Sequence, residues 1–592
     1  MFEIGVAKSA IHWDASPVGM LGYAQHAQTV QGQRTELFVR AFAIRNEAGH
    51  RICLVSAELC WITQAVRQEV LARLASTYPH LELNEHNLLL SATHTHSAPG
   101  GFSHHFLYNL SVGGFVPKFF DSICDATLQA ITEAFGKLQP GTVGHAKMEI
   151  PSHEPVAFNR SIEAYNANPD VTPMAPRHRN RAVNRRMTLL RFDSAAGRPL
   201  GAISWFGVHA TSIDSDNREI DSDNKGYAAR TFEQIMRKRH HCNDFVGAFA
   251  QTTPGDVSPN FRWDPQRRLH VGPTDSAEAN ARINGEIQCR YAMKLFRKAR
   301  LTPMTDPRLW SRIRYEDHGK APVDPRYTFG RSAPRTRRAM FGISMAMGTT
   351  DGRGPLFGLR PVVRAINGLA KKRSPLPWAE DRDDGRGAQF PFLDLSRGNG
   401  GRMLALFSQA RPPIPGWIYP PLGRIQELSG IDADLHHPWA PEVVPVQLCL
   451  IGNLAIAGLP GEPTTVAGRR LGHSVHQALR ASGIDEVLVA GYCNAYSSYI
   501  TTYHEYQQQA YEGGCTLFGP WTLAAYQTRF DRLAKALVSS PTTKASDTGA
   551  SPYVAPERCM KARSFASEGE AVQRGRTIRT IPLPAASSAT GT

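Results

Sequence analysis

The sequence predicts an α/β fold with a mixed β-sheet core and flanking helices. In the first half of the chain, short apolar runs typical of buried strands alternate with turns and amphipathic helical patterns. The length of 592 residues, with 42% apolar and 20% charged residues, is that of an ordinary globular protein with a large core. The sequence contains no run of about 18 apolar residues, so it predicts no transmembrane helix.

The first elements follow one another in this alternating order. Residues 51–57 predict a buried strand, residues 65–76 an amphipathic helix and residues 87–92 the next strand. A second helical pattern covers residues 119–137 and ends before a Pro-Gly pair, which cannot continue a helix.

The chain is predicted to form one unit over residues 1–538. Within it, residues 305–440 are rich in Pro, Gly and Arg and are expected to be a loop-rich insertion on the same core. Regular structure resumes at residues 445–456, and a last helix covers residues 521–538. Residues 539–592 are dominated by Ser, Thr, Ala, Pro and charge. We expect this tail to be disordered, because it cannot bury enough apolar surface to offset its ordering entropy.

Charge and cysteine usage narrow the possible partners. The nine cysteines form no C-x-x-C pair, which argues against a thiolate zinc site, so a bound metal would need nitrogen and oxygen ligands. The net charge is +15, but the basic runs lack the aromatic residues of nucleic-acid modules. A solvated basic surface explains them, and peripheral contact with an anionic membrane is the next interpretation.

No secretory signal is visible at the start, so the sequence as it stands predicts a cytoplasmic protein.

Histidines stand at the ends of two apolar runs. His94 and His96 follow the predicted strand 87–92, and alternate residues of a strand point to the same side. This spacing suits a metal ligand beside a catalytic imidazole. His209 follows a second strand-like run, 203–206. Hydrogen-bonded structural histidines explain the first pattern equally well, and a lone histidine such as His209 is more often structural than a ligand.

Two further turns carry candidate groups. Glu462 follows an apolar strand within Gly-Leu-Pro-Gly-Glu, where its carboxylate would complete a His/His/Glu zinc site or would serve as a favourable charge at a helix N-terminus. Ser258 lies in Gly-Asp-Val-Ser-Pro-Asn, where it would act as a nucleophile or stabilise the turn. No G-x-S-x-G elbow surrounds it.

Taken together and in this order, the segments resemble the neutral/alkaline ceramidase family. The matching segments run from residue 4 to about residue 538 and include Thr93-His-Thr-His-Ser-Ala-Pro-Gly-Gly101, Trp205-Phe-Gly-Val-His-Ala-Thr-Ser212, Gly255-Asp-Val-Ser-Pro-Asn260, Gly348-Thr-Thr-Asp-Gly352, Pro460-Gly-Glu462 and Tyr511-Glu-Gly513. The resemblance implies the catalytic-domain fold of that family. Three features usual in that family are not expected from this sequence: the export signal, a cysteine-bearing loop after Asn260, and the C-terminal β-sandwich domain, in whose place stands the segment 539–592.

The resemblance also implies roles for individual residues. The four implied zinc ligands are His94, His209, Glu462 and Tyr499. The implied catalytic and substrate-binding residues are Ser258, His96, Arg160, Tyr511 and Gly22. Among these, Arg160 and Tyr511 would hold the substrate amide or its developing oxyanion, and Gly22 would line the site near the head group.

The implied activity is zinc-dependent hydrolysis of the amide bond of ceramide or a similar N-acyl sphingoid lipid, giving a fatty acid and a sphingoid base. We expect one zinc per chain and a metal-activated water as the attacking group, with His96 as the proton shuttle and Ser258 as the alternative nucleophile. Two alternatives remain at this point. The chain would be a zinc amidase or esterase of the same fold acting on another acylated substrate, or a lipid-binding homologue without turnover.

Overall fold

The structure is a computed structural model and describes residues 2–14, 18–112, 114–330, 334–372, 388–396, 438–540 and 547–554. Its larger sheet has eight strands in the order β13-β11-β10-β8-β1-β4-β5-β6. These strands are β13 (Val246–Ala250), β11 (Pro199–Trp205), β10 (Arg186–Ser194), β8 (Gln139–Glu149), β1 (Phe2–Ile11), β4 (Leu37–Asn46), β5 (Arg51–Ala57) and β6 (Leu88–Ala92). The β5–β6 and β11–β13 pairs are parallel and the other pairs are antiparallel.

The smaller sheet has four strands in the order β17-β20-β21-β23. They are β17 (Leu309–Asp317), β20 (Val443–Ile451), β21 (Leu454–Gly458) and β23 (Glu486–Ala490). One face of this sheet is covered by two helices, α9 (Thr465–Ala478) and α12 (Thr522–Ser539).

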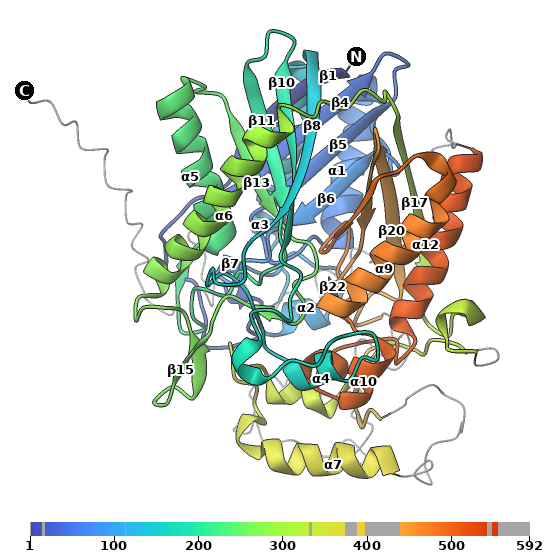
Figure 1. Ribbon diagram of the computed structural model, residues 1–592. Coiled ribbons are helices and arrows are strands. Elements are labelled where there is room, and N and C mark those ends of the chain that lie inside the picture. The colour runs from blue at the N-terminus through green and yellow to red at the C-terminus, as the bar shows by residue number, and fades with distance from the viewer. Residues whose placement is uncertain are drawn as a thin grey trace, which may run out of the picture.

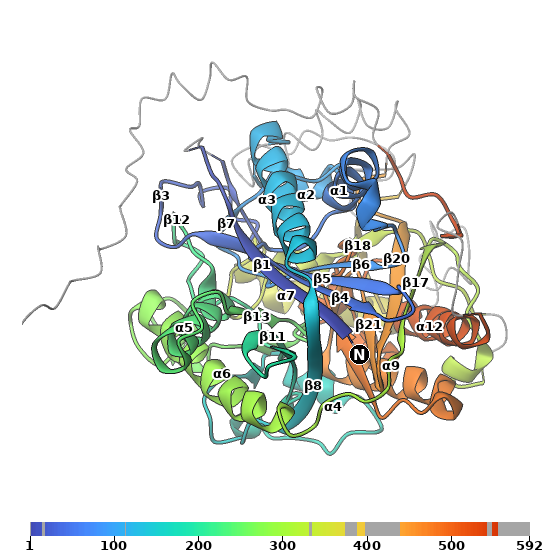
Figure 2. The same ribbon diagram turned by 90° about the horizontal axis from the view of Figure 1, so that it is seen from above.

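The two sheets pack face to face between outer layers of helices (Figures 1 and 2). In β1, Ile4 and Val6 point toward the smaller sheet, where they share a core with Ile456. The alternate residues Ala7 and Ile11 join a core with the helices on the opposite face. Because both faces of the strands are buried, the strands are apolar over nearly their whole length. The layers are therefore helices, sheet, sheet and helices.

Four helices cover the outer face of the larger sheet. They are α1 (Gln64–Thr77), α3 (Pro117–Gly136), α5 (Asp223–His240) and α6 (Ala277–Ala299). The mixed-sheet α/β class is confirmed, and so are the strands at 51–57 and 87–92 and the helices at 65–76, 119–137 and 521–538, each within three residues at either end. The arrangement of two sheets face to face was not predicted.

The segment expected to be a loop-rich insertion, residues 305–440, begins with a core strand, β17. It also contains β18 (Met340–Gly342), α7 (Arg360–Lys372) and β19 (Pro391–Asp394). The rest of it, residues 373–387 and 397–437, lies outside the described residues.

Part of the expected tail is described. Gly549 forms a parallel bridge with Tyr315 of β17, where the Ala550 N–H donates to the Tyr315 carbonyl over 2.9 Å. The disorder expected for the remainder stays a prediction. None of the helices in the described part of the chain is long and apolar enough to cross a membrane.

Candidate metal centre and active site

Loops that follow two strands of the larger sheet, the edge strand β6 and β11, which lies next to the opposite edge strand β13, bring His94 and His209 together. His94 follows β6 and His209 follows β11, and the two loops meet in a parallel bridge between Thr95 and Ala210. The two imidazole rings lie 4.8 Å apart, centroid to centroid. His94 has φ +72°, a conformation that is uncommon for a residue with a side chain and is found where the surrounding structure holds it.

The smaller sheet supplies the other two groups. Glu462 opens β22 (Glu462–Pro463), a short strand beyond β21, and Tyr499 opens β24 (Tyr499–Ile500), beyond β23. These two strands are parallel, with Glu462 directly opposite Tyr499. Loops of both sheets therefore meet at one point.

The four side chains converge there. The Glu462 carboxylate lies 3.6 Å from His94 Nε2 through one oxygen and 3.2 Å from His209 Nε2 through the other. The Tyr499 hydroxyl lies 3.4 Å from His209 Nε2. One ligand atom from each of the two histidines and Glu462 falls within 4.8 Å of the others, and all three residues are buried. These are nitrogen and oxygen donors, as the cysteine pattern requires.

Backbone carbonyls fix the orientation of both imidazoles. The His94 Nδ1–H donates to the Cys60 carbonyl over 2.7 Å, and the His209 Nδ1–H donates to the Pro254 carbonyl over 2.7 Å. Each Nε2 then carries the ring's lone pair, which is the form in which a histidine binds a metal. A second possible group, Cys60 with His94 and His96, is less suited to a metal, because the carbonyl occupies His94 Nδ1 and burial raises the pKa of the Cys60 thiol.

Electrostatics favour the protonation states that a metal requires. Burial lowers the pKa of His94 to about 3, so this imidazole is neutral at pH 7. Burial would raise the pKa of Glu462, but the neighbouring His94 and His209 outweigh it and hold that pKa at about 2. Tyr496, a residue not singled out from the sequence, also donates its hydroxyl to Glu462. A neutral imidazole beside an ionised carboxylate is the arrangement that binds a divalent metal.

Arg160 lies beside this cluster, at the end of the short strand β9 (Phe158–Asn159). It donates to the Tyr499 hydroxyl over 3.0 Å. It is held between two buried carboxylates, Glu512 at 2.8 Å and Asp351 at 3.3 Å. Its guanidinium is therefore fixed in one orientation at the edge of the candidate metal centre.

Asp351 links Arg160 to Ser258, which ends β14 (Val257–Ser258), the antiparallel partner of β9. The Ser258 hydroxyl donates to the other Asp351 oxygen over 2.6 Å and accepts from the Asn260 N–H over 2.9 Å. Among the described residues, no histidine is hydrogen-bonded to Ser258, so the serine lacks the basic partner of a Ser-His pair.

His96 and Gly22 form another part of the site. His96 Nε2 lies 3.0 Å from His94 Nε2, and within the described chain His96 Nδ1 has no hydrogen-bond partner. Gly22 has φ +128°, and a Cβ there would lie 2.4 Å from the His96 ring. Gly22, which follows β2 (Met20–Leu21), is therefore required for the ring to occupy this place.

Tyr511 completes the set named from the sequence. It opens α11 (Tyr511–Gly514) and packs edge-on against the Tyr499 ring, with centroids 5.5 Å apart. The Arg160 guanidinium lies 5.9 Å from its ring centroid. Asp351 and Glu512 were not assigned roles from the sequence, although both lie in segments that carry the family resemblance. Their roles depend on contacts across about 190 and 350 positions of sequence.

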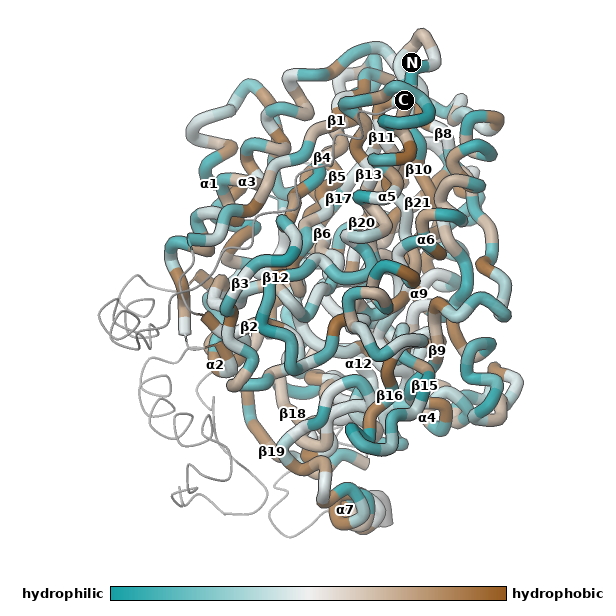
Figure 3. The backbone as a smooth tube through the Cα atoms, turned by 90° about the vertical axis from the view of Figure 1, so that its left-hand side faces the viewer, coloured by the Kyte–Doolittle hydropathy of each residue, from teal (hydrophilic) through white to brown (hydrophobic). Residues whose placement is uncertain are grey.

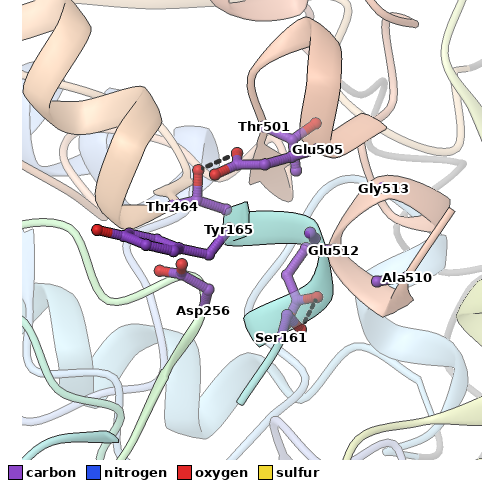
Figure 4. Close-up of a pocket in the computed structure, with 10 residues that line it drawn as sticks. Ser161, Tyr165, Asp256, Thr464, Thr501, Glu505, Ala510, Glu512 and Gly513 are labelled. Atoms are coloured by element: carbon purple, nitrogen blue, oxygen red, sulfur yellow. Dashed lines mark hydrogen bonds between the residues drawn. The ribbon is translucent and has the colours of Figure 1, made fainter. Parts of the chain in front are cut away.

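Next to Glu512, a small cavity is lined by two further buried carboxyl groups, those of Glu505 and Asp256 (Figure 4). Glu505 accepts from the Thr464 hydroxyl over 2.5 Å, and Asp256 accepts from the Thr465 N–H over 2.7 Å. Burial raises the pKa of Glu505 to about 7, with Asp256 adding to the rise. Burial also raises the pKa of Asp256 to about 6.

The variant Glu505→Gln is therefore expected to change the pH dependence of stability. The folded protein binds the Glu505 proton more tightly than the unfolded chain does, so this group makes the free energy of unfolding fall as pH rises from about 4.5 to about 7. The variant should match the parent near pH 4.5 and be more stable at pH 8, by on the order of 1–3 kcal/mol. Thermal unfolding at both pH values measures this. The control is the exposed Glu286→Gln, whose stability relative to the parent should be the same at both pH values. If Glu505→Gln also differed from the parent by the same amount at both pH values, the prediction would be contradicted.

The fold and the site together define a class: a mixed α/β protein with two packed sheets and a buried group of two histidines and one carboxylate, a candidate metal centre, beside a fixed arginine. Residues 2–365 and 428–528 match the family described as neutral/alkaline non-lysosomal ceramidase, N-terminal. This chain belongs to the neutral/alkaline ceramidase family.

Individual relatives agree with this assignment. The chain is 37% identical to the neutral ceramidase of Pseudomonas aeruginosa, over 90% of this chain and 72% of that protein. It is 34% identical to the neutral ceramidase of Mycobacterium tuberculosis, over 91% and 77%. A solved structure described as a ceramidase complexed with C2 superposes with a TM-score of 0.75 at 35% identity, covering 94% of this chain and 77% of that one. The family resemblance seen in the sequence is confirmed.

Proposed function

We propose that this protein hydrolyses the N-acyl amide bond of ceramide or a similar N-acyl sphingoid lipid, using one bound zinc ion. The observation that carries the proposal is the convergence of His94, His209, Glu462 and Tyr499 in a buried centre. Relatives named neutral ceramidases at 31–37% identity support the reaction and the lipid class.

The side chains present fit a zinc ion. Two imidazole nitrogens and a carboxylate oxygen are a common catalytic zinc set. One oxygen of the buried Glu462 carboxylate has no hydrogen-bond partner in the described part of the chain, although it faces His209. Such an orphaned oxygen is explained by a cation. When bound, zinc would polarise a carbonyl group and lower the pKa of water.

Residues around the centre would carry the remaining chemistry. Arg160, which donates to the Tyr499 hydroxyl, would stabilise the oxyanion that forms at the amide carbonyl, with Tyr499 and Tyr511 close by. His96 would take the proton of the attacking group and give it to the leaving amine. Burial lowers the pKa of His96, so its ring is neutral, and Nδ1, which has no hydrogen-bond partner in the described part of the chain, is open to receive that proton.

We infer that water, rather than Ser258, attacks the amide carbonyl. The Ser258 hydroxyl donates to Asp351, and a carboxylate is a far weaker base than the imidazole that normally activates a serine. Ser258→Ala should therefore lower kcat by at most about 100-fold, whereas removing a serine nucleophile typically costs about 10⁶-fold.

The turnover of zinc-loaded Ser258→Ala checks this inference. Asp351→Asn is the matched comparison, because it disturbs the same hydrogen bond and should give a loss of similar size. A loss near 10⁶-fold in Ser258→Ala, or a fatty acyl group trapped on Ser258 in the parent protein, would make the serine the nucleophile.

A substrate panel tests the proposed lipid class. The zinc-loaded protein should release fatty acid from N-acyl sphingoid bases much faster than from N-acyl amino acids or simple acyl esters of the same chain length. Equal or faster cleavage of the latter compounds, with no release from the sphingoid amides, would assign the site to another acylated substrate.

A further inference from the structure

The helix α7 exposes apolar side chains to solvent. Val362 and Leu369 are 53% and 57% exposed, and Leu359, in the turn before the helix, is 52% exposed. Val362, Ala365 and Leu369 recur at helical spacing, so they share one face. The opposite side of α7 is anchored, because Val363 is buried and the Asn367 amide donates to the Ser344 hydroxyl over 2.7 Å. The exposed face therefore belongs to a helix fixed on the protein.

Arginines lie along one side of this apolar face. Arg353 and Arg364 both lie close enough to Arg360 to repel it, and burial together with that repulsion lowers the pKa of Arg360. Arg360 stacks on the Phe357 ring, 3.9 Å from its centroid. Among the described residues, none of the three arginines forms an ion pair. An apolar face bordered by uncompensated positive charge is complementary to an anionic lipid surface.

The helix lies at the end of the molecule that carries the candidate site. It packs on the turn Ile343–Met347, and Ser344 of that turn meets Gly514 of α11, the helix that begins with Tyr511. Figure 3 places α7 at the margin of the molecule, beyond β18 and β19. The hairpin of β15 (Arg262–Asp264) and β16 (Leu269–Val271) reaches the same end in Figure 1, with Trp263 50% exposed.

The family match covers only the first half of this helix. It stops at residue 365, in the middle of α7, and resumes at residue 428. Leu369 and the run Lys371-Lys372-Arg373 therefore lie in a stretch outside the matched family segments.

We propose that α7 docks this protein on anionic phospholipid bilayers, with Val362 and Leu369 entering the interface and Arg353 and Arg364 facing the lipid head groups. This goes beyond the proposed function, since it holds whichever acylated lipid the site cleaves. Docking through α7 would place the candidate site close to a membrane that contains a lipid substrate.

Vesicle binding by the full chain tests the proposal, with phosphatidylcholine vesicles that contain about one third phosphatidylserine or none. The double variant Val362→Glu/Leu369→Glu should bind anionic vesicles at least about tenfold more weakly, because two apolar side chains no longer enter the interface. Arg353→Gln/Arg364→Gln should lose affinity only for the anionic vesicles, by about fivefold per arginine at low salt. The control is Leu301→Glu. Leu301 is 81% exposed and lies in the connection between α6 and β17, at the other end of the molecule from α7 (Figure 1). The Leu301→Glu variant should bind both kinds of vesicle as tightly as the parent does.

Unchanged binding of Val362→Glu/Leu369→Glu, or an equal loss in Leu301→Glu, would overturn the proposal. Sedimentation without vesicles tests the alternative that this face binds a second copy of the chain. If the parent sedimented as a dimer and the double variant as a monomer, the face would be a dimer interface instead. The double variant should cleave a short-chain substrate dispersed without vesicles at the parent rate. This rate separates a failure of docking from a failure of the proposed amidase activity.

Discussion

Replacing His94, His209 or Glu462 with alanine is expected to remove zinc and abolish hydrolysis. Each variant leaves two of the three strong ligands in a buried centre, and partners that only orient such ligands already contribute about 10–100-fold to metal affinity. We therefore expect a loss of more than about 100-fold in zinc affinity and of at least that size in turnover. Metal analysis of purified, folded variants and fatty acid release measure the two effects.

Cys60→Ala is the control for these variants. The Cys60 thiol lies 3.7 Å from His94 Nδ1, but the group that holds this histidine is the Cys60 backbone carbonyl, which the substitution keeps. The control should therefore bind zinc like the parent. If Cys60→Ala lost zinc while Glu462→Ala kept it, the metal site would have to be assigned to Cys60, His94 and His96 instead.

Arg160→Gln is expected to lower kcat by about 10²–10³-fold. The substitution removes the charged donor beside the Tyr499 hydroxyl that is proposed to stabilise the developing oxyanion, and one such donor typically contributes this much to the rate. It also leaves the Glu512 and Asp351 carboxylates buried without their cation, so the variant should be less stable as well.

A second buried arginine separates these two effects. Arg40 lies between Glu58 and Glu233 at 2.7 and 3.1 Å, and within the described residues it makes no hydrogen bond to the four proposed ligands. Arg40→Gln should lose stability to a similar degree, but the rate per folded molecule should stay near that of the parent. Turnover measured at a temperature where both variants are folded shows whether Arg160 contributes to the rate itself or only to stability. Equal loss of rate in the two variants would make the role of Arg160 structural.

Local patterns could predict the strands and the histidines that follow them. Hydrophobic periodicity located β5, β6 and α3, and the step from an apolar run to a polar turn marked His94 and His209 as candidates. Patterns of this kind depend only on neighbouring residues, so they are visible in a single sequence.

Long-range pairing could not be predicted in the same way. Tyr499 meets Glu462 only because β22 and β24 pair in parallel beyond the smaller sheet, and no local signal distinguishes it from the other tyrosines nearby. Asp351 became a candidate only once the structure placed it between Arg160 and Ser258. The strand β17 was not predicted, because it lies in a region rich in Pro, Gly and Arg that suggested loops. The structure pairs it with β20 along its whole length.

Zinc reconstitution coupled to amide hydrolysis tests the central claim most directly. The purified chain would be stripped with a chelator, titrated with zinc and assayed for fatty acid release from an N-acyl sphingoid base, with zinc content measured at each point. The proposed centre predicts that activity is lost on chelation and returns in proportion to bound zinc, reaching its maximum at about one zinc per chain. Full activity in the metal-free protein, or no fatty acid release at full zinc occupancy, would contradict it.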